Sequence, residues 1–149
     1  MTLRVITVGK KHDDWIAPGL ERYQKRLKRP FDVEWVFISG YDEHKARQDE
    51  SERILSRLDP SDYVILMDET GQLLSSPALA QLLDERFTHG SVTIIIGGAY
   101  GVSDSLKQRA NLMWSLSPLV FPHQLVRLLL IEQLYRSQQI LAGSGYHHE

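Results

Sequence analysis

Two short runs of almost purely apolar residues do most to limit what this chain can fold into. Residues 63–67 read YVILM and residues 92–96 read VTIII, and both are rich in the β-branched and aromatic side chains that favour strands. A strand with apolar side chains on both faces is typical of a sheet covered by helices on both sides. We therefore expect a buried central sheet.

Strand-like and helix-like segments alternate along most of the chain. Strands are also predicted at residues 3–8 and 33–38. Apolar residues recur between the strands at helical spacing: Ile16, Leu20, Tyr23 and Leu27, then Leu79, Leu82, Leu83 and Phe87, then Leu106, Ala110 and Met113. This βαβαβαβα order predicts an α/β sandwich with a mostly parallel sheet, and 149 residues fit a single domain spanning 1–149.

Helix boundaries can be predicted at two of these segments. Ser76 followed by Pro77 indicates an N-cap and a first helical residue, and Ser103 indicates the cap of the next helix. Residues 44–58 are polar except for Ile54, Leu55 and Leu58, so the helix predicted there is expected to be solvated.

The last third of the chain departs from the alternation. A short strand-like piece leads into a loop that Pro118 and Pro122 stiffen, and one long helix follows until Gly143 ends it. Residues 125–131 are apolar all round the helix except for Arg127. Such a helix must be buried on more than one side, either as a core helix of a monomer or against a second subunit.

Composition narrows the class of protein. The chain has no cysteine, which excludes disulfides and thiolate zinc sites and fits a reducing cytoplasm. The N-terminus lacks the pattern of a signal peptide, and no apolar run is long enough to span a bilayer. A net charge of −2 argues against a protein that binds polyanions through overall positive charge.

A glycine-rich turn follows the strand predicted at 92–96. Gly97, Gly98 and Gly101 stand where a strand leads into a helix, and glycine lets a ligand approach the backbone closely. Ligands of open α/β sheets bind at this edge of the sheet. The spacing is not that of a dinucleotide fingerprint, and a tight turn without a ligand stays open as an alternative.

The loop over residues 117–122 is stiff and mostly apolar, which suits a flat aromatic ligand such as adenine. His123 follows it and is either a capping group or a functional one. Arg127 must find a buried carboxylate, a backbone acceptor or an anionic substrate, because an unpaired buried guanidinium is too costly.

Two other regions are candidates for contacts with ligands. Met67 ends a predicted strand and is a candidate pocket wall, whereas Asp68 and Glu69 after it are expected to be turn residues. A basic cluster around the end of the first predicted helix is either a solvated face or a site for RNA phosphates. Its candidate RNA-binding residues are Arg22, Lys25, Arg26 and Arg29.

The chain ends in AGSGYHHE, which brings Tyr146, His147, His148 and Glu149 together on a flexible stretch. Terminal residues are often frayed. Two adjacent histidines match neither a purification tag nor a metal site well, since no further ligand cluster accompanies them. A frayed end and a functional tail both remain open on residue types alone.

Taken together, the segments IIIGGAYG, WSLSPLVFPHQLVRLLLIEQLYR and GYHHE resemble the SPOUT methyltransferases. Within them, the chain is similar over its whole length to the ribosomal RNA large subunit methyltransferase H family. The resemblance implies a C-terminal deep trefoil knot, a homodimer packed through the knot region, and S-adenosylmethionine as methyl donor. It also implies a substrate, namely N3 of a pseudouridine in helix 69 of 23S rRNA on assembled 70S ribosomes, with neither a metal nor a membrane involved.

The resemblance assigns residues to this activity. It implies a cofactor pocket made of Met67, Gly98, Ser117, Pro118, Leu119, Val120, Phe121 and Pro122. Tyr146 and His147 are the expected catalytic pair, handling the proton of the imide and positioning the base. His148 stands where some relatives have arginine or lysine, so a titratable group replaces a permanent cation.

Two functions of other classes stay open beside this interpretation. A non-catalytic ribosome-binding factor would bind the particle without binding the cofactor. An oxidoreductase would use the glycine turn for a nucleotide, although the turn lacks the full dinucleotide spacing.

Overall fold

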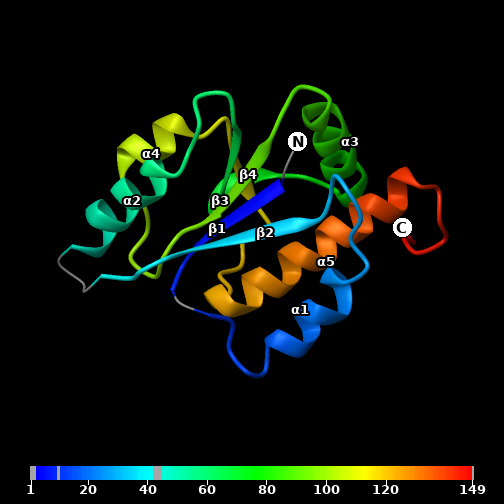
Figure 1. Ribbon diagram of the computed structural model, residues 1–149, viewed down its shortest axis with the longest axis horizontal. Coiled ribbons are helices and arrows are strands. Elements are labelled where there is room, and N and C mark those ends of the chain that lie inside the picture. The colour runs from blue at the N-terminus through cyan, green and yellow to red at the C-terminus, as the bar shows by residue number, and fades with distance from the viewer. Residues whose placement is uncertain (1–2, 10, 42–44, 149) are drawn as a thin grey trace.

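Five strands form one fully parallel sheet in the order β2-β1-β4-β3-β5 (Figure 1). The computed structural model describes residues 3–9, 11–41 and 45–148. The strands are β1 (Leu3–Val8), β2 (Val33–Ile38), β3 (Tyr63–Leu73), β4 (Val92–Ile96) and β5 (Leu112–Ser115). Every residue of β4 is buried, which confirms the central, doubly covered strand.

Helices cover both faces of the sheet, as Figure 1 shows. One face carries α1 (Ala17–Gln24), α3 (Ser76–Phe87) and α5 (His123–Leu141), and the other carries η1 (Ala46–Glu50), α2 (Ser51–Ser56) and α4 (Asp104–Arg109). Each face has its own apolar core, built by residues that alternate along the strands: Ile94 and Ile96 belong to the first core, Ile95 to the second. The predicted α/β sandwich is confirmed. Within the described residues no helix is long and apolar enough to cross a bilayer.

Helix α5 lies between α1 and α3 on the first face of the sheet and is the longest of the three (Figure 1). Leu130, Ile131 and Leu134 are completely buried against the sheet. The helix ends as predicted, with Gly143 in the left-handed conformation at φ 71°. It begins at His123, two residues before the predicted start.

Three local expectations were wrong. The cap of α3 is Ser75, whose hydroxyl accepts from the Ala78 amide, and Ser76 is already helical. Met113 lies in β5, not on the helix before it. The segment from Ala46 to Ser56 is solvated on one side only, because Glu50 and Ser51 are buried with Ile54 on the other. Residue 44, where that helix was expected to begin, lies outside the described residues.

Strand β3 continues past the predicted end at Met67. After an interruption its last part pairs with β5 again, and the two backbones come very close together. The pairing shifts between Met67 and Gln72. A Cβ on Gly71 would lie 2.6 Å from the backbone carbonyl carbon and oxygen of Met113. Only glycine allows the two backbones to meet here, and this contact holds the end of β3 beside β5.

Replacing Gly71 with alanine should therefore destabilise the protein, because backbone atoms cannot move aside as a side chain can. We expect Gly71→Ala to lower the free energy of unfolding by about 2–3 kcal/mol, measured by urea denaturation. Gly40→Ala is the control, since its Cβ would meet only ordinary contacts at 3.6 and 3.7 Å. Equal stability of the two variants would contradict the close crossing.

Candidate functional site

A cavity of about 330 Å³ opens at the carboxyl ends of β4 and β5, beside the middle of β3. Three segments supply its walls: residues 67–69 of β3, the glycine turn after Ile96, and the loop before α5. The lining residues from the predicted cofactor pocket are Met67, Gly98, Ser117, Leu119, Val120 and Phe121, whereas Pro118 and Pro122 are not part of the lining. The structure thus brings together two motifs that are separate in the sequence.

Glycines are needed in the turn after β4 because other elements press against its backbone. A Cβ on Gly97 would lie 2.8 Å from the Val102 side chain, and one on Gly98 would lie 2.5 Å from Glu50 Oε1. Gly101 has φ 82°, which favours glycine, and it forms a bridge with Gly98. The turn therefore presents bare backbone to the cavity.

The loop before α5 is held by its own hydroxyl groups. Ser115 Oγ donates to the carbonyl of Ser117 at 2.8 Å, and the Leu119 amide donates to Ser117 Oγ at 3.0 Å. The side chains of Leu119 and Val120 are 69% and 73% exposed. The loop is thus ordered by local hydrogen bonds while its apolar side chains remain available to a ligand or a partner.

Glu50 is a functional candidate that sequence reasoning missed. The side chain is 4% exposed, and its Oε2 accepts from the Tyr41 amide at 2.9 Å. Its Oε1 is buried, has no hydrogen-bond donor among the described residues, and faces Gly98. The spacing of Ala46, Glu50 and Ile54, four residues apart and all buried, was the available signal.

Arg47 and Ser51, on either side of Glu50 in the chain, form hydrogen bonds that hold the same segment against the glycine turn and the residues after it. Arg47 Nε donates to the carbonyl of Tyr100 at 3.3 Å, and Ser51 Oγ accepts from the Ser103 amide at 2.8 Å. The position of the cavity wall therefore depends on η1 and the first residue of α2.

Arg127 finds backbone acceptors. It is 1% exposed, and it donates to the carbonyls of Lys11 at 3.0 Å and Val8 at 3.1 Å, with His12 Nδ1 at 3.3 Å. Burial lowers the pKa of Arg127, and Asp13 opposes this. Of the alternatives open for this residue, the structure shows a backbone partner, and the guanidinium joins α5 to the end of β1.

Two histidines flank this guanidinium. Burial, followed by the charge of Arg127, lowers the pKa of His12 below its usual 6.5. The same two causes lower the pKa of His123, although a hydrogen bond to the Gly97 backbone and the charge of Glu50 oppose them. His123 also lines the cavity, so it is more than a capping group at the start of α5.

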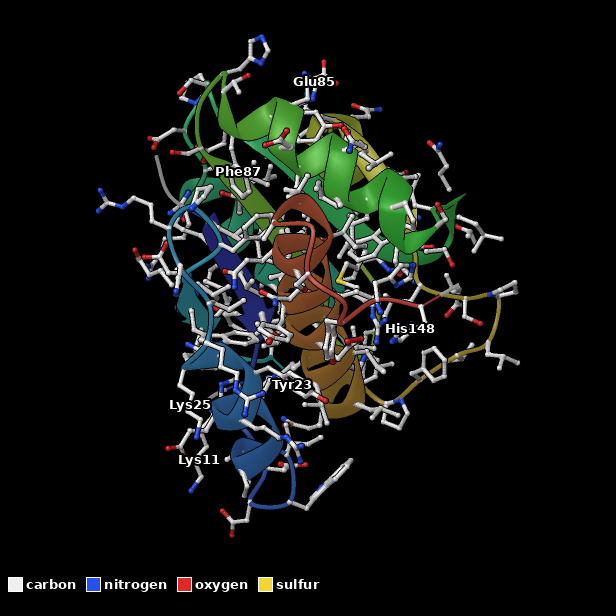
Figure 2. All side chains as sticks on the ribbon, turned by 90° about the vertical axis from the view of Figure 1, so that its right-hand side faces the viewer. Lys11, Tyr23, Lys25, Glu85, Phe87 and His148 are labelled. Carbon is white, nitrogen blue, oxygen red and sulfur yellow. The ribbon has the colours of Figure 1, made fainter. Side chains whose placement is uncertain are left out.

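The tail folds back onto α5, as Figure 2 shows with His148 beside the helix. The Tyr146 ring meets Tyr135 edge-on at 4.9 Å, and its hydroxyl donates to Glu132 Oε2 at 3.4 Å. Arg136 stacks over the Tyr146 ring at 4.8 Å, and its Nη1 lies 3.1 Å from His147 Nδ1. Burial, followed by Glu132, raises the pKa of Tyr146 to about 12. The described part of the tail is ordered, but none of it lines the cavity.

The four basic residues predicted to bind RNA are not part of the cavity lining. Arg22, Lys25, Arg26 and Arg29 are exposed on α1 and just after it (Figure 2 labels Lys25). Asp68 and Glu69 are not turn residues as predicted but lie within β3, where its pairing with β5 is interrupted. Asp68 accepts from the amide and hydroxyl of Thr70 at 2.8 and 2.6 Å, and both acidic residues line the cavity. No group of three or more His, Asp or Glu side chains within the described ranges could hold a metal ion.

Comparison with known proteins gives a consistent result. A family model described as "Predicted SPOUT methyltransferase" matches residues 1–147. A protein of Hahella chejuensis named "Ribosomal RNA large subunit methyltransferase H" is 39% identical over 156 residues, covering 100% of both chains. A protein of Caldicellulosiruptor saccharolyticus with the same name is 40% identical, covering 97% of this chain and 99% of that protein.

Gly98→Ala should force Glu50 out of its position, because the carboxylate is buried and has little room to move. We expect a loss of about 1–3 kcal/mol in the free energy of unfolding. Combining Gly98→Ala with Glu50→Ala removes the clash, so the double variant should be more stable than the sum of the single effects predicts by about 1 kcal/mol. Additive effects in urea denaturation would show that the two residues do not interact.

Stability should fall at mildly acidic pH because of His12 and His123. Their pKa values are lowered in the folded state, so their contribution is complete above pH 6.5 and is lost as the pH falls below that value. Unfolding in urea from about pH 7.5 to about pH 5.5 should show this decline. It should be shallower in the variant His12→Gln/His123→Gln, and an unchanged slope would rule out these two groups as its source.

Proposed function

Because the chain belongs to the SPOUT methyltransferase family, we propose that it methylates N3 of a pseudouridine in helix 69 of 23S rRNA on assembled 70S ribosomes in the cytoplasm. S-adenosylmethionine is the proposed methyl donor. The observation that carries this proposal is the meeting of the glycine turn and the proline-flanked loop at one cavity. The names of the relatives support the choice of ribosomal RNA as substrate.

The residues around the cavity fit a bound S-adenosylmethionine. Its volume of about 330 Å³ lies in the range of ligand pockets. Leu119 and Phe121 offer apolar surface for a flat base, and the bare backbone at Gly98 allows close approach. The carboxylates of Asp68 and Glu69 suit a positively charged sulfonium. We propose that Pro118 and Pro122 act by stiffening the loop.

When bound, S-adenosylmethionine supplies an electrophilic methyl group. The imide nitrogen of the base is a poor nucleophile until its proton leaves, so the protein must accept that proton or stabilise the charge that develops on the flanking carbonyls. Holding the base close to the cavity provides much of the remaining rate enhancement.

Tyr146 and His147 are proposed to act on the base in different ways. With a pKa of about 12, Tyr146 keeps its proton at neutral pH and serves as a hydrogen-bond donor that orients the base. The His147 imidazole, held beside Arg136 at 3.1 Å, is the proposed proton acceptor. Glu132 and Arg136 are positioning residues, because they contact the tail rather than the cavity.

We propose that the protein acts as a homodimer with a trefoil-knotted C-terminal region. Leu125, Leu129 and Ile140 on α5 are only partly buried and pack against neither apolar core. A second copy on this face would cover them. It would also bring the tail of one protomer towards the cavity of the other, since the described tail does not line its own. Arg22, Lys25, Arg26 and Arg29 are proposed to contact RNA phosphates.

The first test is transfer of labelled methyl from S-adenosylmethionine to ribosomes that lack the modification, with the product nucleoside identified by mass. We expect label on N3 of pseudouridine. Deleting residues 146–149 should abolish transfer and leave the affinity for S-adenosylmethionine, measured by calorimetry, within about twofold, because no described tail residue lines the cavity.

Single variants separate the two proposed roles. Tyr146→Phe should retain more activity than His147→Ala, since it keeps the ring that packs on Tyr135. A truncated protein that transfers methyl at the normal rate would remove the tail from the mechanism. A folded protein that labels no RNA would contradict the proposed function as a whole.

A further inference from the structure

A second hollow, of about 340 Å³, lies beside the edge strand β2. Its lining comes from the end of that strand and from α2: Phe37, Ile38, Ser39, Arg53, Ser56 and Arg57. We call it the Arg53–Arg57 hollow. None of these residues takes part in the proposed methyl transfer, and the sequence analysis assigned none of them to RNA.

Among the described residues, the charged side chains that line the hollow are both positive. Arg53 and Arg57 are four residues apart on the same side of a helix, where like charges repel. Neither makes an ion pair with any described residue, and no carboxylate lines the hollow. Arg53 stacks over the Tyr41 ring at 5.3 Å, which holds its guanidinium in place. Two exposed guanidiniums beside serine hydroxyls suit the oxygens of one phosphate.

One partly exposed aromatic ring lies at the same edge strand but on its other face. The alternation along β2 puts Phe37 on the side of Trp35, where Arg127 lies over its ring at 5.8 Å, and puts Ile38 on the side of α2. Phe37 is 37% exposed, and its ring stacks on Trp35 at 6.1 Å with an interplanar angle of 14°. Trp35 Nε1 donates to Gln24 Oε1 at 3.0 Å, and His12 packs edge-on against both rings. Bases of single-stranded RNA stack on rings that are held in this way.

One side of the hollow, formed by residues 37–39, lies at the carboxyl end of the sheet as the cavity does, whereas the Arg57 carbonyl accepts from Arg4 near the start of β1. Phe37 and Ile38 end β2, just as Ile96 ends β4, and only β1 lies between these strands. Two strand spacings put the ends of β2 and β4 about 10 Å apart. Nucleotides that flank a base held at the glycine turn can therefore reach the hollow.

We propose that the Arg53–Arg57 hollow binds a backbone phosphate of single-stranded RNA next to the target nucleotide, with a neighbouring base stacked on Phe37. This inference rests on the proposed function and adds to it an RNA contact at β2, separate from the basic cluster on α1. RNA is then recognised beside the carboxyl end of β2 as well as at the cavity.

The test compares Arg53→Gln and Arg57→Gln with Lys107→Gln, which removes one exposed charge from α4. Binding of a fluorescein-labelled single-stranded RNA oligonucleotide is measured by anisotropy from low to moderate salt. Each arginine variant should weaken binding and reduce the slope of log affinity against log salt by about 0.7, the value for one lost phosphate contact. Lys107→Gln should leave the slope unchanged, and Arg53→Lys should retain most of it.

Methyl transfer to ribosomes provides the second readout. The double variant Arg53→Gln/Arg57→Gln should raise KM about tenfold or more with kcat nearly unchanged, since it removes binding without touching the cavity. Phe37→Leu should weaken oligonucleotide binding by about tenfold with the salt slope kept, because a stacked ring carries no charge.

The outcomes separate this inference from the proposed function. Arginine variants that match Lys107→Gln in salt slope and KM would overturn the hollow as an RNA site while methylation by the unmodified protein stands. Oligonucleotide binding that depends on both arginines, without any methyl transfer, would support the hollow and overturn the function. A raised KM with an unchanged salt slope would indicate that the hollow contacts a ribosomal protein, which would overturn the inference. Failure of the unmodified protein to bind the oligonucleotide at low salt would also overturn it.

Discussion

One buried guanidinium connects the two ends of this chain. Arg127 lies in the second turn of α5 and donates to the carbonyls of Val8, the last residue of β1, and Lys11, which follows that strand. A buried cation without hydrogen-bond acceptors would be strongly destabilising, so the helix must meet the end of β1 in one register. That register also sets His123 beside the Gly97 backbone and the loop of residues 117–122 against the glycine turn. The positions of the cavity walls thus depend on where the Arg127 guanidinium finds its backbone acceptors.

Close contacts made by glycine define the rest of the site. Gly71 lets β3 cross β5, and Gly98 lets the buried Glu50 approach the turn. In both places the partner lies more than forty residues away in the chain. The site is consequently built from contacts between segments rather than from any one motif, which explains why the cavity needs η1, the glycine turn and α5 together.

The sequence predicted the fold well and the site in part. Strands over 3–8, 33–38 and 92–96 could be predicted to the residue because β-branched and aromatic side chains are concentrated in each of them, and β4 is in addition buried on both faces. Burial of Glu50 could not, since it depends on the missing side chain of Gly98 forty-eight residues later. The catalytic role of the tail residues stays a prediction, and their place on α5 could not be predicted because it depends on contacts with Tyr135 and Glu132 that no local pattern encodes. The Arg53–Arg57 hollow was missed because its two sides belong to different elements.

The long-range contacts of α5 also govern when the protein becomes complete during its synthesis. The Asp13 amide donates to Gln124 at 2.8 Å and the Lys28 amide to Gln138 at 2.7 Å, so the last helix holds the segments before and after the first one. A nascent chain that has exposed β1 to β4 still lacks the partner that covers that face of the sheet. Contacts between such distant segments form slowly. The cavity is therefore incomplete until α5 has been made and has packed against the sheet.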